Sequence, residues 1–181
     1  MLSHNDILIK LKEISIESLK KTRFTKNEEN FIFDALYVNN EDIINAALLI
    51  ILESNEKPII NRFLKNFDSY TKKVAHFSIP ILASTDNIDV YTFLLTRLKQ
   101  NISKDETSII IHCLAYTHFP ILPKILSFLL SDDTTFVNHL KKCLSLMNKN
   151  TLLNYLATLP FIPHEKVFHD ILGESVVKNI K

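Results

Sequence analysis

The stretch DSYTKKVAHFSIPILAS, residues 68–84, ends on the four residues ILAS, and similar short segments recur along the chain. Similar endings are separated by steps of 30, 32, 30 and 28 residues: ILES from Ile51, ILAS from Ile81, CLAY from Cys113, CLSL from Cys143 and ILGES from Ile171. An internal repeat with a period of roughly 20 to 50 residues is typical of repeat proteins. It predicts stacked units, each of which buries its apolar face only against its neighbours.

Each repeat unit is predicted to be a pair of helices. Apolar residues recur mostly at spacings of three and four, and few stretches alternate with period two. The predicted pairs, after a leading helix at about 4–21, span residues 26–53, 56–83, 87–116, 119–147 and 149–172. We therefore expect one all-α domain over residues 1–181, a right-handed α-solenoid (alpha-alpha superhelix) of about five helical hairpins, with an N-terminal capping helix in 1–24 and repeats in 25–175.

Part of the opening stretch resembles a known repeat family. Asp68 precedes Lys72 by four residues, and the sequence VAHFSIPILA follows, which is similar to the second helix of a HEAT repeat. Asp42 and Thr134 stand at the positions equivalent to Lys72. The ladder of Asp and basic residues typical of that family is therefore mostly missing, and a degenerate armadillo-like repeat is the alternative. The resemblance implies second helices that line a concave face; a globular bundle of hairpins without a groove is a further alternative.

Pro80 lies near the end of the helix expected over residues 68–84. A proline at this position removes the hydrogen bond to the His76 carbonyl and kinks the last turn of the helix. A curved stack of helices absorbs such a kink, so the structural explanation is preferred over a functional hinge.

Composition excludes several classes of enzyme. The chain has a single glycine, Gly173, whereas the G-x-G-x-x-G dinucleotide loop, the Walker A loop and the G-x-S-x-G elbow each need more than one. The 21 basic and 20 acidic side chains give a net charge of +1. That balance is far from the strongly basic one typical of nucleic-acid-binding domains.

The N-terminal segment and the cysteines predict a cytoplasmic protein. Charged residues interrupt the apolar residues near the N-terminus, so no signal-peptide core is expected. The longest apolar run, residues 46–52, is too short to span a membrane. Cys113 and Cys143 lack C-x-x-C spacing and fit a reducing compartment. We therefore expect a soluble protein with no membrane partner.

Two patterns of histidine and cysteine resemble metal sites. In HEKVFH, His164 and His169 are five residues apart, so they fall on different faces of a helix and cannot share a metal as the histidines of H-E-x-x-H do. His139 and Cys143 are four apart, and a second His-Cys pair at 112–113 lies one repeat earlier. Cysteines at equivalent repeat positions are expected to be core residues, so no metal site is predicted.

Adjacent acids are expected to stabilise helix starts. They occur at Glu28-Glu29, Glu41-Asp42, Asp105-Glu106 and Asp132-Asp133, and Thr25-x-x-Glu28 and Ser103-x-x-Glu106 form capping-box patterns. Every pair falls in the predicted first turn of a helix, where negative charge complements the helix dipole. This interpretation is preferred over paired catalytic carboxylates.

Basic clusters offer an alternative function. They comprise Lys20, Lys21, Arg23 and Lys26, then Lys72 with Lys73, and Lys141 with Lys142. Several such charges on one surface would bind phosphates, and some DNA glycosylases have HEAT-like folds, so the resemblance also admits a nucleic-acid-binding protein or a glycosylase-type enzyme. That hypothesis is disfavoured, because acids share the same helices and the chain has no tryptophan.

The preferred prediction is a noncatalytic function in protein binding. The scaffold would receive a segment of a partner protein on the concave face of its second helices, with no cofactor, no metal and no catalytic residue. The expected contact residues are polar positions on successive second helices: Lys72, Lys73, His76, Lys104, Ser108, His112, Asn138, Lys141 and Lys142.

Overall fold

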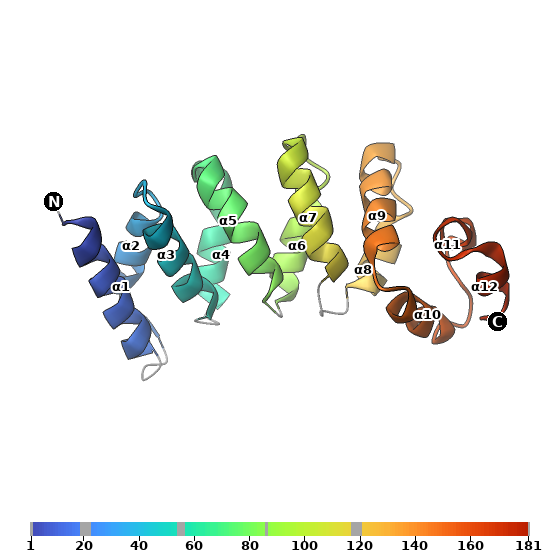
Figure 1. The fold of residues 1–181 in the computed structure, drawn as a ribbon, viewed down its shortest axis with the longest axis horizontal. Coiled ribbons are helices and arrows are strands. Elements are labelled where there is room, and N and C mark those ends of the chain that lie inside the picture. The colour runs from blue at the N-terminus through green and yellow to red at the C-terminus, as the bar shows by residue number, and fades with distance from the viewer. Residues whose placement is uncertain (1, 19–22, 54–56, 86, 117–120, 181) are drawn as a thin grey trace. The chain divides into compact units, whose positions relative to one another are not determined.

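The structure is a computed structural model that describes residues 2–18, 23–53, 57–85, 87–116 and 121–180. Every regular element within these ranges is a helix, and none is a strand. This confirms the predicted all-α class (Figure 1). None of the described helices combines the length and the apolar character that a membrane-spanning helix requires.

The helices follow the predicted pairs closely. In chain order they are α1 (His4–Ser18), α2 (Lys26–Ala35), α3 (Glu41–Glu53), α4 (Lys57–Lys65), the 3-10 helix η1 (Phe67–Ser69), α5 (Lys72–Ala83), α6 (Ile88–Arg97), α7 (Lys104–Tyr116), α8 (Leu122–Phe128), α9 (Thr134–Leu146), α10 (Lys149–Ala157), α11 (Glu165–Leu172) and α12 (Glu174–Lys178). The predicted ends of the leading helix, at 21, and the predicted start of the fourth pair, at 119, lie outside the described residues. Helix α12 was not predicted, and it packs against α11 with Val177 fully buried.

Polar side chains fix where several helices begin. The Thr25 hydroxyl accepts a hydrogen bond from the Glu28 amide at 3.3 Å, and the Glu28 carboxylate accepts one from the Thr25 amide at 2.6 Å. This confirms the predicted capping box of α2. Ser103 accepts from the amide of Glu106 at the start of α7, at 3.2 Å, and Asp133 caps α9 in the same way.

Helix α5 begins later than the sequence predicted. The expected helix over residues 68–84 starts at Lys72, because the Thr71 hydroxyl accepts a hydrogen bond from the Val74 amide at 3.3 Å and so caps the helix there. Asp68 lies in η1, before α5 starts. Pro80 lies inside α5 near its C-terminal end, as expected, and is exposed.

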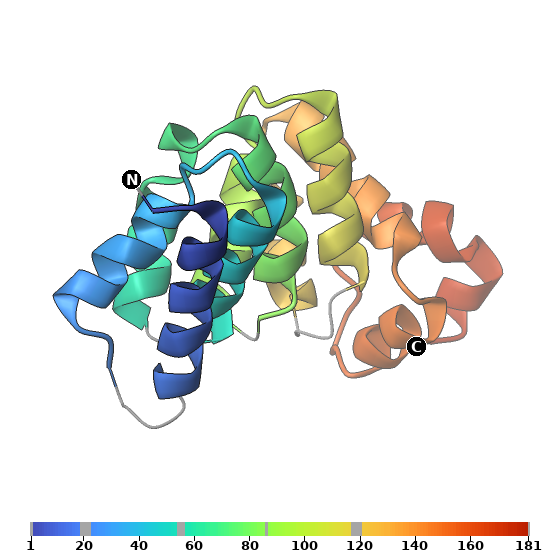
Figure 2. The ribbon, with the colours of Figure 1, turned by 60° about the vertical axis from the view of Figure 1, so that its left-hand side comes forward.

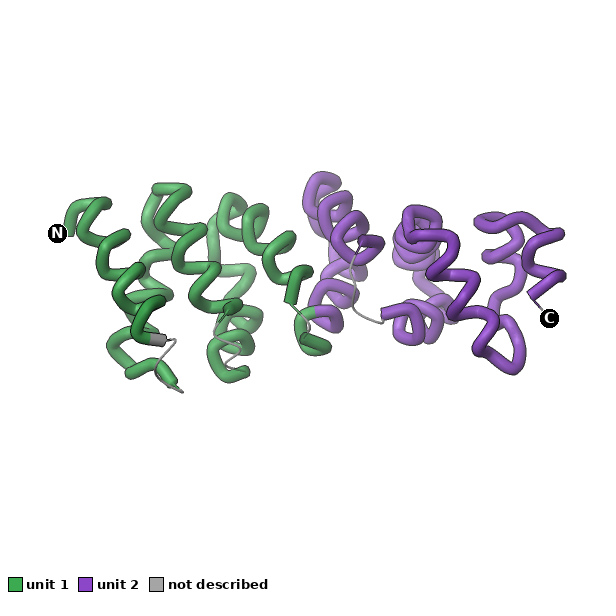
Figure 3. The backbone as a smooth tube through the Cα atoms, turned by 60° about the horizontal axis from the view of Figure 1, so that its bottom comes forward, with its two compact units in different colours: residues 1–90 green, residues 91–181 purple. Residues whose placement is uncertain are grey.

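The chain divides into two compact units, residues 1–90 and 91–181 (Figure 3). In the first unit α3 packs against α1, α2, α4 and α5, and Figure 2 shows α1, α2 and α3 side by side. Aromatic rings fill the contact around α4: Phe63 stacks on Tyr70 with centroids 5.2 Å apart and meets Phe67 edge-on at 5.9 Å. All three side chains are buried.

In the second unit, the second helices of successive pairs pack against one another. Helix α7 packs against α9, and α9 packs against α11. The buried face of α9 consists of Phe136, Leu140, Cys143 and Leu144, each with no exposed surface. This i, i+4, i+7, i+8 spacing is that of an amphipathic helix, so the opposite face of α9 presents its polar side chains.

A buried arginine joins α6 to α7. Arg97 is 9% exposed; its Nε donates to Glu106 Oε1 at 2.9 Å, and its Nη1 donates to Gln100 Oε1 at 2.7 Å. These contacts tie the end of α6, the loop that follows it and the first turn of α7 to one guanidinium group. An ion pair this well shielded from water resists screening by salt.

We expect Glu106→Gln to lower the free energy of unfolding by about 2 kcal/mol, because the substitution replaces the charged acceptor of a buried guanidinium group with a neutral one. The control is Asp105→Asn at the exposed neighbour, which should change the free energy of unfolding by only about 0.5 kcal/mol. Urea denaturation followed by circular dichroism measures both. Equal effects for the two variants would contradict the structural role of the ion pair.

Candidate functional site

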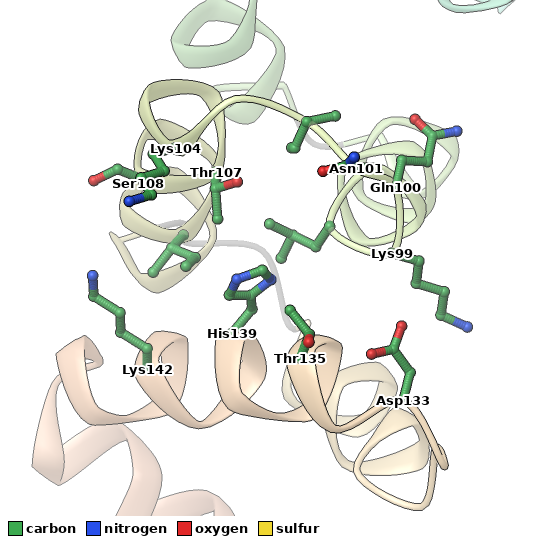
Figure 4. A pocket seen from close by; sticks show the side chains of 13 residues that line it. Lys99, Gln100, Asn101, Lys104, Thr107, Ser108, Asp133, Thr135, His139 and Lys142 are labelled. Atoms are coloured by element: carbon green, nitrogen blue, oxygen red, sulfur yellow. The ribbon is translucent and has the colours of Figure 1, made fainter.

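A pocket of about 590 Å³ lies between α7 and α9 in the second unit (Figure 4). Helix α7 contributes Lys104, Thr107, Ser108 and Ile111 to its wall, and α9 contributes Thr135, His139 and Lys142. The loop from Leu98 to Ile102 and the Asp133 cap of α9 complete the lining. The pocket therefore lies between two second helices and the loop that precedes the first of them.

Helical spacing explains why these side chains share one pocket. On α7, Lys104 and Ser108 are four residues apart, as are Thr107 and Ile111; on α9, His139 follows Thr135 by four. Residues three or four apart lie on the same face of a helix. Each helix thus presents one polar stripe, and the packing of α7 on α9 makes the two stripes face each other.

The two ends of the pocket differ in charge. Lys104, Ser108 and Lys142 lie at one end, and Asp133 lies at the other (Figure 4). Lys99 lines the Asp133 end, but its ammonium lies over the rings of Phe128 and Phe136, 4.5 and 4.9 Å from their centroids. A cation held over aromatic faces in this way is already partly stabilised. The cationic end is therefore formed by Lys104 and Lys142.

His139 lies between the two ends, with its imidazole in the pocket (Figure 4). Its Nδ1 atom is buried and makes no hydrogen bond with the described residues. A buried polar atom without a partner costs about 1–3 kcal/mol. A ligand in the pocket would remove this cost only if rotation of the imidazole ring brought Nδ1 toward it.

Three of the nine predicted contact residues meet in the pocket: Lys104, Ser108 and Lys142. Three others from the same helices, His112, Asn138 and Lys141, are exposed and do not line it. The His112 ring folds back on its own helix, with Nδ1 2.8 Å from the Ser108 carbonyl. Because a carbonyl only accepts, Nδ1 carries the hydrogen in that contact.

The remaining three predicted residues lie on α5 in the first unit. Lys72 and His76 are exposed. Lys73 forms an ion pair with Glu41 of α3 at 2.8 Å, which links the second helices α3 and α5.

Sequence reasoning missed His139 and Thr135 as pocket residues. A signal for them exists in the spacing, since His139 precedes Lys142 by three residues and follows Thr135 by four. The spacing of His139 and Cys143, four residues apart, points instead to a pair of metal ligands. The loop from Leu98 to Ile102 carried no such signal, because helical periodicity says nothing about where a loop folds.

The histidines and cysteines of the two metal-site patterns have different surroundings in the structure. Cys143 is fully buried in the core and Cys113 is half-buried; both are free. Among the described residues no group of three His, Cys, Asp or Glu side chains is arranged to hold a metal ion. In HEKVFH, His164 is the N-terminal flanking residue of α11 with a left-handed backbone, φ 54°, and His169 lies 3.4 Å from Glu165.

The basic cluster near the N-terminus is only partly described. Lys20 and Lys21 lie outside the described residues, while Arg23 and Lys26 are exposed in the first unit. The Lys141–Lys142 pair splits, because Lys142 lines the pocket and Lys141 does not.

Comparisons with protein-family models, with curated proteins and with solved structures found no match to this chain. Function is therefore inferred from the chain's own residues.

We expect Cys143 to resist alkylation in the folded protein. Burial raises the pKa of its thiol to about 12 and also raises the pKa of the Cys113 thiol, so little of the reactive thiolate forms at neutral pH. In a Cys113→Ala variant, iodoacetamide labelling followed by mass spectrometry should modify Cys143 only after unfolding. Prompt labelling of the folded variant would show that this position is not a core residue.

Proposed function

We propose that this chain is a noncatalytic protein-binding module, a HEAT-like right-handed α-solenoid whose second helices present the binding face. The 28- to 32-residue repeat supports the stacking, as does the packing of α3 on α5 and of α7 on α9 within their units. The two free cysteines fit a cytoplasmic location.

The observation that carries this proposal is the pocket between α7 and α9. Its volume of about 590 Å³ falls within the range of roughly 300–1,000 Å³ that is usual for ligand pockets. Part of the pocket wall is apolar and consists of Leu98, Ile102 and Ile111. Polar side chains of α7 and α9 line the rest of the wall on either side. Such a mixture suits a side chain of a bound segment, which brings both apolar surface and hydrogen-bonding groups.

A glycosylase-type or nucleic-acid-binding function is the alternative, and the lining argues against it. Proteins that bind single strands stack bases on aromatic side chains, yet no Phe, Tyr or Trp is among the described lining of this pocket. The carboxylate there, that of Asp133, caps α9 through the Phe136 amide at 3.0 Å. This carboxylate therefore serves as the N-terminal cap of α9 and is not proposed as a catalytic group.

Site-specific photo-crosslinking tests the proposal. The photoreactive residue p-benzoylphenylalanine replaces His112 or Asn138, which are exposed on α7 and α9, or Ser127 on the first helix α8 as a control. The full chain is then irradiated in a lysate of its source cells. We expect the same protein adduct at the positions of His112 and Asn138 and none at that of Ser127, because the partner segment lies across the second helices.

Nuclease treatment separates the two functions. Adducts that survive it and are identified as one protein by mass spectrometry support the binding module. Adducts that disappear with nucleic acid would instead favour the alternative function, and equal adducts at all three positions would contradict a defined binding face.

A further inference from the structure

We infer that the pocket between α7 and α9 binds an acidic side chain of the partner segment, with its carboxylate at the end formed by Lys104 and Lys142. This inference rests on the proposed binding of a protein segment and names the chemistry of its anchor. The second unit has a net positive charge, with ten basic and seven acidic side chains over residues 91–181.

What distinguishes Lys104 and Lys142 is that both line the same end of one pocket and neither forms an ion pair with a described residue. Lys57, Lys73 and Lys178 form ion pairs with carboxylates at 3.2, 2.8 and 2.5 Å. Neither Lys104 nor Lys142 makes such a pair with a described residue, although both line one pocket. Two ammonium groups at the same end of a pocket repel each other, and an anion bound there replaces that repulsion by two attractions.

Hydrogen-bonding groups at the same end suit a carboxylate. Ser108 lies beside Lys104 (Figure 4), and its hydroxyl can donate to an oxygen of the ligand. Thr107 is different, because its hydroxyl already donates to the Ser103 carbonyl at 2.9 Å. The donors available to an anion are therefore the two ammonium groups and the Ser108 hydroxyl.

His139 adds a group that responds to the ligand. A flip of its ring about the Cβ–Cγ bond exchanges the positions of Nδ1 and Cδ2, which moves the unpaired Nδ1. Because Nδ1 is buried and has no partner among the described residues, only the flipped ring can pair it with a polar group of the bound segment, and that pairing would stabilise the complex. The imidazole thus favours a polar occupant over a purely apolar one.

The rest of the lining limits the occupant to a single acid beside apolar residues. Asp133 at the other end repels a second carboxylate, and Leu98, Ile102 and Ile111 supply apolar contact. No arginine is among the described lining residues, and phosphoryl groups are commonly bound by arginine clusters through bidentate contacts. The lining therefore favours a carboxylate over a phosphorylated side chain.

Nuclear magnetic resonance titration of the ¹⁵N-labelled full chain tests this inference. The probes are three end-capped peptides, Ala-Leu-X-Leu-Ala, in which X is Glu, Gln or phosphoserine. We expect the Glu peptide to shift the amide signals of the pocket residues on α7 and α9 and to bind about tenfold more tightly than the Gln peptide. No shift with the Glu peptide, equal affinity for the Gln peptide, or tighter binding of the phosphoserine peptide would each overturn the assignment.

Variants locate the anion within the unit. Lys104→Gln and Lys142→Gln should each weaken the Glu peptide about tenfold and leave the Gln peptide unchanged. The matched control is Lys149→Gln on α10, an exposed lysine that does not line the pocket, which should change neither affinity. Unshifted signals from the first unit show that each variant is folded. Equal weakening by Lys149→Gln would overturn the pocket as the site.

The crosslinking result separates this inference from the proposed function. Protein adducts on α7 and α9 together with no preference for the Glu peptide would leave segment binding intact and refute the acidic anchor. Loss of the protein adducts themselves would refute the function on which the inference rests.

Discussion

Arg97, at the end of α6, donates from one guanidinium group to Glu106 in the first turn of α7 and to Gln100 in the intervening loop. The loop lines the pocket, and so do Lys104, Thr107 and Ser108 from the adjoining turns of α7. One buried guanidinium group therefore holds both sides of this wall in register. The opposite wall is rigid for a different reason, because α9 has a fully buried apolar face behind it.

Several polar groups at helix starts and between helices are used for structure. Side-chain oxygens of Thr25, Ser103, Asp133 and Asn148 accept hydrogen bonds from amides at helix starts, and Lys57, Lys73 and Lys178 are paired with acids. The pocket brings together two lysines and one imidazole nitrogen that lack such partners among the described residues. Unsatisfied polar groups at a concave position are where a ligand gains most on binding.

Helix pairs and caps could be predicted because they depend on local sequence: spacing at three and four, the Thr25–Glu28 box and the acids at helix starts. The exact residue at which a helix starts was harder to predict, because several polar residues nearby could cap it. The start of α5 moved to Lys72 because Thr71 caps the chain there. The pocket needed tertiary information, since only the packing of α7 on α9 shows that Lys142 lines the pocket and its neighbour Lys141 does not. The partial resemblance to a HEAT repeat carried no information about these positions.

The central claim is that α7 and α9 form the pocket wall before any ligand binds, and paramagnetic relaxation measures this directly. A nitroxide label is attached at Asn138→Cys, exposed on α9, in a chain with Cys113→Ala and Cys143→Ala. The account predicts that amide signals of residues 107–112 of α7 broaden strongly in the ligand-free protein. Undiminished signals from that segment would show that the two helices do not pack together and would contradict the account.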